Sequence, residues 1–68
     1  MRNHFAANLQ KLRLKKGITQ GKLADDLLLS RPNIGAYEEA RAAPKYDQLI
    51  QIAEYFNITI DELLKTEL

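Results

Sequence analysis

The sequence contains no cysteine, and its only histidine is His4. Disulfide bonds are therefore excluded, and so are the Cys/His clusters that bind structural zinc. No apolar run approaches the roughly 18 residues that a membrane-spanning helix needs, and we recognise no signal peptide before the domain. We therefore expect a cytoplasmic protein without membrane contact, metal or other cofactor, held together by packing.

Residue combinations that carry catalysis are also missing. The sequence has no Ser/His/Asp arrangement, no phosphate-binding loop and no metal-ligand spacing. The adjacent carboxylates at positions 25–26 and 38–39 point in different directions on a helix, so neither pair can act jointly. We expect that the protein is not an enzyme.

The length of 68 residues allows a single domain, residues 1–68, in which folding buries only about 60% of the surface of the unfolded chain. The net charge of +1 hides an asymmetry between the two ends of the chain. Residues 1–24 carry six basic side chains and no acidic one, whereas residues 46–68 carry five acidic side chains and one lysine. Such a chain can present a positive face to phosphates, although a solvated lysine-rich helix has the same composition.

The spacing of apolar residues predicts five short helices. We expect them over about residues 3–16, 20–27, 31–39 and 45–56, and from residue 60 onward, with His4 partly exposed in the first. One apolar face of each helix is expected to form the core, made of Phe5, Leu9, Leu12, Leu23, Ala24, Leu27, Ile34, Tyr37, Leu49, Ile52, Ala53, Phe56, Ile60, Leu63 and Leu64.

Start and stop signals agree with these ranges. Gly17 follows two lysines, which is typical of a helix end, and Thr19 is a plausible N-cap. Pro32 fits the first helical turn, where its missing N–H is not needed. Thr59 and Glu62 match a capping box that opens the last helix.

Helices of this length are not stable alone, so each must contribute its apolar face to a shared core. We therefore predict an all-α fold, a compact orthogonal bundle of five helices. The second and third helices are joined only by Leu28 and Leu29, which forces a tight angle between them. That geometry is the helix-turn-helix.

Three stretches of the sequence, at residues 17–24 (GITQGKLA), 30–38 (SRPNIGAYE) and 56–64 (FNITIDELL), agree at fixed offsets with one family. The chain resembles the Cro and lambda-repressor-like (XRE) helix-turn-helix proteins over about residues 5–65. The resemblance implies a lambda-repressor-like DNA-binding domain: a sequence-specific regulator of transcription, expected to be a repressor, whose helix 31–39 lies in the major groove of double-stranded DNA.

Within that family, the first half of the third helix contacts base edges. The side chains that fall away from the Ile34/Tyr37 face are Arg31, Pro32, Asn33 and Ala36. Arginine can bond guanine with two hydrogen bonds, asparagine can bond adenine, and alanine can meet the thymine methyl group. Pro32 offers apolar contact only.

The resemblance also implies roles for other residues. Gln20 matches a glutamine that clamps a phosphate at the start of the second helix, where backbone N–H groups are free. Arg13 and Glu38 match a partly buried salt bridge between the first and third helices. We expect further phosphate contacts from three exposed cations, namely Lys22, Arg41 and Lys45.

Three positions depart from the family pattern. Leu28 stands where glycine is frequent, so either the turn is wider or backbone strain is accepted. Gly35 lies inside the third helix, at a propensity cost of about 1 kcal/mol, and Glu39-Ala40 replaces a frequent Asn-Gly ending.

A single domain of this kind contacts few base pairs, so we expect a homodimer on a palindromic operator. Surplus apolar side chains on the acidic half, at Tyr46, Ile50 and Leu68, are candidates for the dimer interface, although ordinary surfaces also expose apolar residues. The alternative function is a protein-interaction module of the same fold, an antitoxin or an adaptor whose main partner is another protein.

Overall fold

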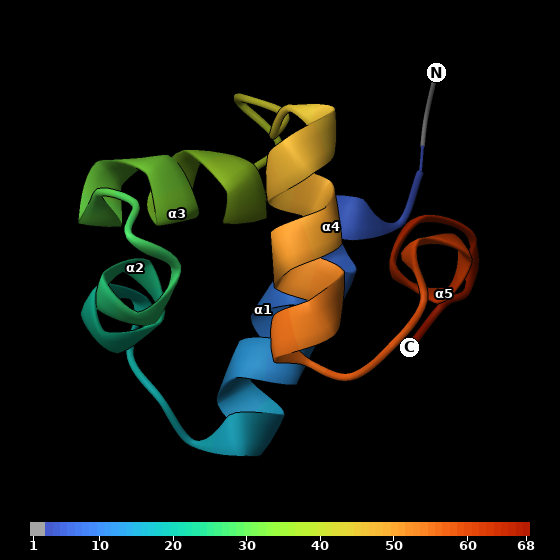
Figure 1. Cartoon of the computed structure of the whole chain (residues 1–68), viewed down its shortest axis with the longest axis horizontal. Helices are drawn as coiled ribbons and strands as arrows, with labels where there is room; N and C mark the ends of the chain where they lie inside the picture. Colours follow the sequence, from blue (N-terminus) through green and yellow to red (C-terminus); the bar gives the residue numbers. More distant parts are fainter. Residues whose placement is uncertain (1–2) are drawn as a thin grey trace.

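The computed structural model describes residues 3–68, so Arg2 of the basic segment lies outside the described residues. Five helices follow one another: α1 (Phe5–Lys16), α2 (Gln20–Leu27), α3 (Arg31–Glu38), α4 (Tyr46–Tyr55) and α5 (Ile60–Lys65). No residue between 3 and 68 lies in a strand, which confirms the all-α prediction. In Figure 1, α3 lies above α2, α4 crosses in front of α1, and α5 lies on the far side of α4 from α2 and α3.

The caps predicted at Thr19 and Thr59 are present, and Ser30 caps α3 in the same way. The hydroxyl oxygens of three residues accept hydrogen bonds of 3.0 to 3.2 Å from the backbone N–H three positions later, and these residues are Thr19, Ser30 and Thr59. In return, a carboxylate oxygen of Glu62 accepts the N–H of Thr59 at 3.0 Å, which completes the capping box.

Several helix ends differ from the prediction by one or two residues. α1 begins at Phe5 rather than at residue 3. The side-chain oxygen of Asn3 accepts the N–H of Phe5, the first residue of the helix, at 2.9 Å. His4 therefore precedes the helix and is exposed. α3 ends at Glu38, and α4 is one residue shorter at each end than the predicted range 45–56.

The α2–α3 turn is tight, and the backbone of one of its residues is strained. Leu28 adopts the left-handed conformation with φ 57°, and the N–H of Leu29 reaches the carbonyl of Ala24 at 2.8 Å. Gly17 ends α1 in the same conformation with φ 76°, without a side chain to oppose it. Of the two possibilities at Leu28, the strained turn is the one adopted, and the leucine side chain is 88% exposed.

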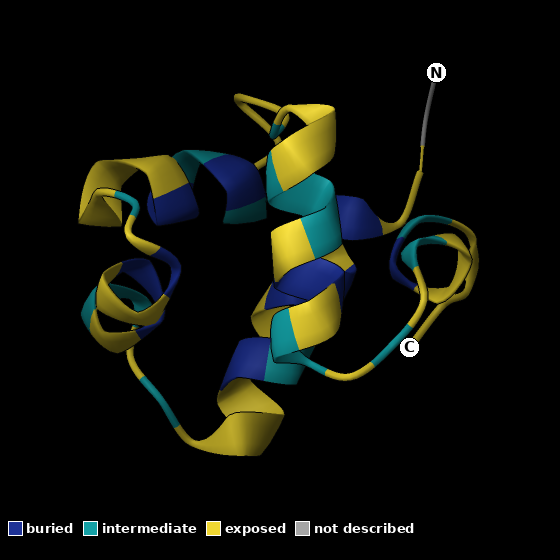
Figure 2. Cartoon of the chain, in the orientation of Figure 1, coloured by how far each residue is buried: buried dark blue, intermediate teal, exposed yellow. Residues whose placement is uncertain are grey.

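The core joins all five helices. Its buried apolar residues are Phe5, Leu9, Leu23, Ala24, Leu27, Ile34, Tyr37, Ile52, Ala53 and Leu63. Five residues predicted for the core are half-buried around it, namely Leu12, Leu49, Phe56, Ile60 and Leu64. Figure 2 shows that the buried positions of α3 face the rest of the bundle, while its first turn is exposed.

One buried polar residue was not predicted. Asn8 is fully buried on α1, and its amide nitrogen donates to the carbonyls of Leu63 at 2.8 Å and Thr66 at 2.6 Å. Its amide oxygen accepts the N–H of Leu68 at 3.0 Å. These bonds satisfy backbone groups at the end of α5 and fix that helix against α1.

None of the helices formed by residues 3–68 is both long enough and apolar enough to cross a membrane.

Candidate nucleic-acid interface

The outer face of α3 carries the side chains predicted to read bases. Ile34 and Tyr37 are buried on the inner face, whereas Arg31, Pro32 and Asn33 are exposed at the start of the helix. Ala36 is half-buried, one turn beyond Asn33. Pro32 stands in the first turn, as predicted, where it leaves no helical acceptor unpaired. The arrangement presents a guanidinium and an amide beside small apolar groups at one end of a short helix.

Gly35 does not belong to that face. It is buried, and a Cβ atom at this position would lie 3.8 Å from the side-chain oxygen of Gln20. The glycine therefore lies under the Gln20 side chain, where α2 and α3 meet. The absence of a side chain at Gly35 therefore removes no contact from the outer face of α3.

Arg13 and Glu38 form a two-bonded ion pair between α1 and α3. The guanidinium Nε lies 2.6 Å from Oε2 of Glu38, and Nη2 lies 3.1 Å from Oε1. Nη1 also donates to the carbonyl of Ile18 at 3.0 Å. The side chains are only 11% and 2% exposed, so this pair is shielded from water and fixes the direction of α3.

Gln20 is attached to the same carboxylate. Its side-chain nitrogen donates to Oε1 of Glu38 at 3.1 Å, so this oxygen accepts from both Gln20 and Arg13. Gln20 is half-buried at the first residue of α2. An amide nitrogen has two hydrogens, and the second remains available for another acceptor. This link could not be predicted from the sequence, because the two residues are 18 positions apart and no local spacing indicates it.

The three cations predicted to contact phosphates are exposed, and two of them contact neighbouring acids. Lys22 Nζ lies 2.9 Å from Asp26, and the hydrogen bond to this carboxylate raises the pKa of Lys22. The Nε of Arg41 lies 3.0 Å from Glu39. Lys45 directly precedes α4. Exposed ion pairs contribute little free energy, so a phosphate can replace either carboxylate at small cost.

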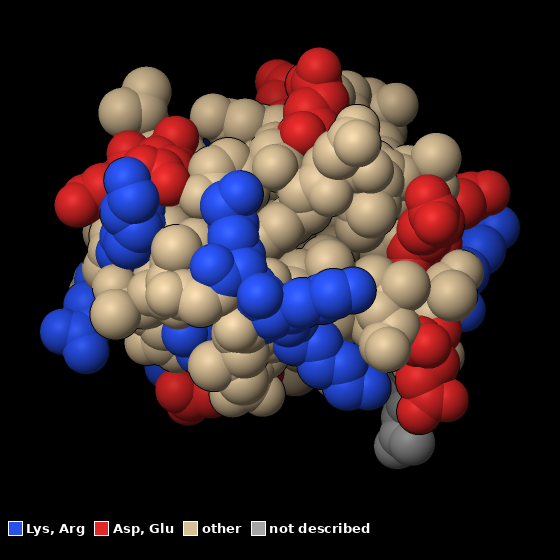
Figure 3. Space-filling view, turned by 90° about the horizontal axis from the view of Figure 1, so that it is seen from below, with Lys and Arg blue, Asp and Glu red and all other residues tan. Residues whose placement is uncertain are grey.

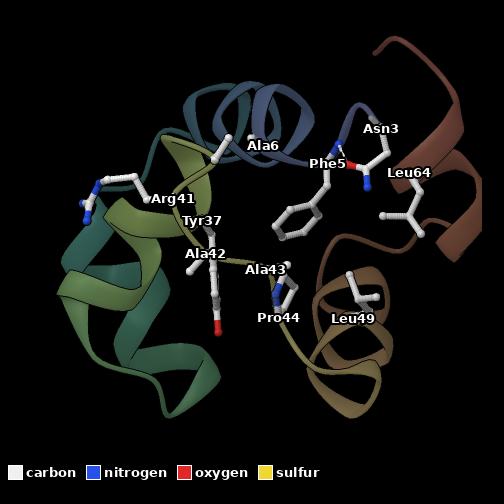
Figure 4. Close-up of a pocket in the computed structure, with 11 residues that line it drawn as sticks. Asn3, Phe5, Ala6, Tyr37, Arg41, Ala42, Ala43, Pro44, Leu49 and Leu64 are labelled. Carbon is white, nitrogen blue, oxygen red and sulfur yellow. Dashed lines mark hydrogen bonds between the residues drawn. The ribbon is translucent and has the colours of Figure 1, made fainter. Parts of the chain in front are cut away.

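A hollow of about 610 Å³ adjoins the end of α3, and Arg41 is among its lining residues (Figure 4). It is bordered by the start of α1, the end of α3, the α3–α4 loop, α4 and α5, and its apolar lining includes Phe5, Tyr37, Ala42, Ala43, Pro44, Leu49 and Leu64. It could not be predicted from the sequence, because its walls come from five separate segments.

Two of the candidate dimer residues lie next to this hollow, because Tyr46 precedes Leu49 by one turn of α4 and Ile50 follows it directly. Tyr46 is 69% exposed, and Ile50 is half-buried. Leu68 is 43% exposed but lies beyond the end of α5 at Lys65, where its N–H bonds the side-chain oxygen of Asn8. Tyr46 and Ile50 therefore continue the apolar border of the hollow outward.

Among residues 3–68, no group of three or more His, Asp or Glu side chains is placed to hold a metal ion.

Comparison with known proteins identifies the same architecture. The family model described as helix-turn-helix matches residues 9–63. The HTH-type transcriptional activator BcrR of Enterococcus faecalis is 41% identical over 63 residues, which are 93% of this chain and 31% of BcrR. The uncharacterized HTH-type transcriptional regulator YqaE of Bacillus subtilis (strain 168) is also 41% identical over 63 residues, which are 54% of its length. The chain thus spans about a third of one relative and about half of the other.

Two solved structures share the fold. A transcriptional regulator from Listeria innocua superposes with a TM-score of 0.88 and 30% identity, over 94% of this chain and 60% of that one. The P22 c2 repressor, solved with the synthetic operator 9T in the presence of Tl+, superposes with a TM-score of 0.86 and 22% identity, over 91% and 94% of the two chains. These proteins are described as regulators or activators of transcription or as a repressor, in agreement with the expectation from the sequence.

Proposed function

The chain belongs to the helix-turn-helix family of Cro and lambda-repressor-like (XRE) proteins, and on that basis we propose that it is a DNA-binding regulator of transcription. The observation that carries the proposal is the division of α3 into two faces. Its inner face is buried on Ile34 and Tyr37, and its outer face offers Arg31 and Asn33 to solvent. A helix anchored in this way can lie in the major groove with its first turn against the bases.

In the proposed complex, Arg31, Asn33 and Ala36 read base edges and Pro32 adds an apolar contact. Gln20, Lys22, Arg41 and Lys45 bind phosphates on either side of the groove. Arg13 and Glu38 do not touch DNA but hold α3 and the Gln20 amide in place. Such a regulator acts in the cytoplasm, on the nucleoid.

We further propose repression as its mode of action. A domain that fills the major groove of an operator excludes other proteins from that site, so repression follows from binding alone. Activation requires an additional contact with a second protein. The relative BcrR is described as an activator, and the P22 c2 protein as a repressor.

Selection of binding sites from a genomic DNA library with the purified protein tests the DNA-binding proposal. We expect enrichment of one sequence, with an affinity that falls as salt rises, at a slope of about −0.9 per phosphate neutralised. A stable complex with a second polypeptide, together with no salt-dependent DNA binding, would instead favour the antitoxin or adaptor function.

The operator is expected to be a palindrome bound by a homodimer, with the two α3 helices about 34 Å apart. The apolar surface proposed for this contact consists of Tyr46 and Ile50, next to Leu49 at the hollow, and of the exposed Leu68. Sedimentation of the parent and of Ile50→Glu, with binding measured on whole and half sites, tests it. A parent that stays monomeric on the palindrome, or binds the half site equally well, contradicts the dimer.

A further inference from the structure

A second hollow lies at the end of the molecule away from α3. It measures about 380 Å³, and its lining comes from the last turns of α1 and α4 and from the turn after α4. Leu12, Tyr55, Phe56 and Ile58 supply its apolar part. In Figure 1, the C-terminal ends of α1 and α4 lie at the bottom of the molecule, while α3 and the loop after it lie at the top. The hollow therefore opens away from α3. Of the side chains proposed to bind phosphates, Lys22 comes nearest to it, through its contact with Asp26, which also bonds Tyr55.

Lysines border this hollow. Lys15 and Lys16 belong to its lining, and the ammonium of Lys16 lies 5.0 Å from the centre of the Tyr55 ring. This cation–π contact holds one positive charge at the edge of the apolar surface. Lys11 lies one turn before Lys15 on the same side of α1. In the part of the chain from residue 3 onward, none of these three lysines takes part in an ion pair.

One acid, Asp26, lies near this border, and the charge of Lys16 acts on its carboxylate. Asp26 reaches Tyr55, but one of its carboxylate oxygens accepts the Tyr55 hydroxyl at 2.6 Å and the other accepts Lys22 Nζ at 2.9 Å. Figure 3 looks onto this end of the molecule, where Lys and Arg side chains gather across the middle of the face and Asp and Glu side chains lie toward its edges. An incoming carboxylate thus meets positive charge without a competing acid between the lysines.

We propose that this hollow docks an acidic segment of a partner protein, which places an apolar side chain between Lys15 and Lys16. Charge complementarity supplies the attraction, and the lining of Leu12, Phe56 and Ile58 supplies an apolar contact. Duplex DNA would use the lysines but leave the apolar surface unfilled, because its outer surface consists of sugars and phosphates. The favourable position of cations at the end of α1 explains the charges but not the hollow. Such a contact goes beyond DNA binding, and it can form while α3 occupies an operator.

A fluorescent peptide of glutamates with one central leucine serves as the probe, and a matched peptide carries alanine in place of the leucine. Anisotropy measures affinity, and amide chemical shifts of ¹⁵N-labelled protein locate the site. We expect shifts concentrated at Leu12, Lys15, Phe56 and Ile58, and weaker binding of the alanine peptide. Lys15→Glu should weaken the leucine peptide about three- to tenfold, since repulsion replaces attraction.

Lys45→Glu is the matched control, because it makes the same change in net charge at the residue before α4, whereas the hollow lies at the last turn of that helix. Lys45→Glu should leave the affinity for the peptide unchanged within about twofold and reduce binding to duplex DNA. Lys15→Glu should reduce the affinity for the peptide and leave binding to duplex DNA unchanged. Equal losses of peptide binding in both variants would overturn the proposal, since the peptide would then respond to the net charge of the protein and not to the hollow. Duplex DNA shifting the same amides, or the same amides shifting with protein concentration alone, would also overturn it in favour of a nucleic acid or a second copy.

Discussion

The side-chain amide of Gln20 donates a hydrogen bond to Glu38 across 3.1 Å, to the same carboxylate that receives the guanidinium of Arg13. One buried acid therefore joins α1, α2 and the end of α3. The residue proposed to clamp a phosphate is oriented by the ion pair that sets the direction of the reading helix. Stability and DNA contact are thus connected through Glu38.

The ion pair should contribute more to stability than an exposed one. Arg13→Ala or Glu38→Ala leaves a shielded charge without its partner, and we expect the free energy of unfolding to fall by about 3–5 kcal/mol. Denaturation by urea measures this loss. Arg41→Ala, which breaks the exposed contact with Glu39, is the control and should cost less than about 1 kcal/mol. Two single losses that simply add in the double variant would show that Arg13 and Glu38 do not interact.

Base reading should depend on Arg31. Arg31→Ala should weaken binding to the selected site by about 1–3 kcal/mol and relax the preference at one or two base pairs of each half site. Gln20→Ala should weaken all sequences to a similar extent, because a phosphate carries no sequence information. Repeating the site selection with both variants separates the two effects. An Arg31→Ala protein with unchanged affinity and preference would rule out α3 as the reader.

Leu28 should be replaceable with a gain in stability. Its φ of 57° is unfavourable for a side chain with a Cβ atom, and the exposed leucine buries little in return. Leu28→Gly should raise the free energy of unfolding by up to about 1 kcal/mol. The greater conformational entropy of glycine in the unfolded chain offsets part of the relieved strain. At Gly17, with φ 76°, the converse change Gly17→Ala should lower it by about 1 kcal/mol. A loss of stability in Leu28→Gly would mean that the leucine contributes a contact that outweighs its strain.

Gly35 should also accept alanine. The added Cβ would meet the side-chain oxygens of Gln20 at 3.8 Å and Glu39 at 3.9 Å, which is ordinary contact. Alanine is better than glycine inside a helix by about 1 kcal/mol, so the midpoint of thermal unfolding should rise. DNA affinity should stay the same, since Gly35 lies under Gln20 and not on the outer face. A lower midpoint would show that α2 and α3 approach too closely for a methyl group.

The contact between Tyr55 and Asp26 should be visible as pH dependence. The hydrogen bond to Asp26 raises the pKa of Tyr55 to about 12 from its ordinary value of 10.0. Because the folded value is the higher one, the stabilisation is complete below pH 10 and is lost as the pH rises toward 12. The same bond lowers the pKa of Asp26, so its contribution is present above pH 3.8 and is lost as the pH falls through the folded value.

The phenolate absorbance of the parent, minus that of Tyr55→Phe, isolates this titration. Asp26→Asn should shift the midpoint of Tyr55 down toward 10, because the charged acceptor is gone. An unchanged midpoint would mean that the Asp26 carboxylate does not hold the phenol.

The parts of the fold that the sequence predicted are those governed by local rules. Thr19 and Thr59 cap helices because a hydroxyl reaches an N–H three residues away, and residues that close in sequence can be recognised as a cap. Apolar spacing likewise placed Ile34 and Tyr37 inside. Asn8 shows why other parts could not be predicted: its partners are 55 to 60 positions away, and a polar residue beside Leu9 gives no sign of them.

The candidate site divides in the same way. Exposure of Arg31, Pro32 and Asn33 follows from the helical period, so the outer face of α3 could be predicted. The link from Gln20 to Glu38 and the two hollows could not, because they exist only where separate helices meet.

The bonds of Asn8 also decide how the molecule opens. Together with the His4 N–H, which donates to the carbonyl of Leu64 at 2.8 Å, they join the first helix of the chain to the last. A six-residue helix at the end of a chain would ordinarily fray. Here, detaching α5 would break the bonds of Asn8 to Leu63, Thr66 and Leu68, so we expect the amides of α5 to exchange with solvent more slowly than those of an ordinary chain end. The first and last helices should therefore open together.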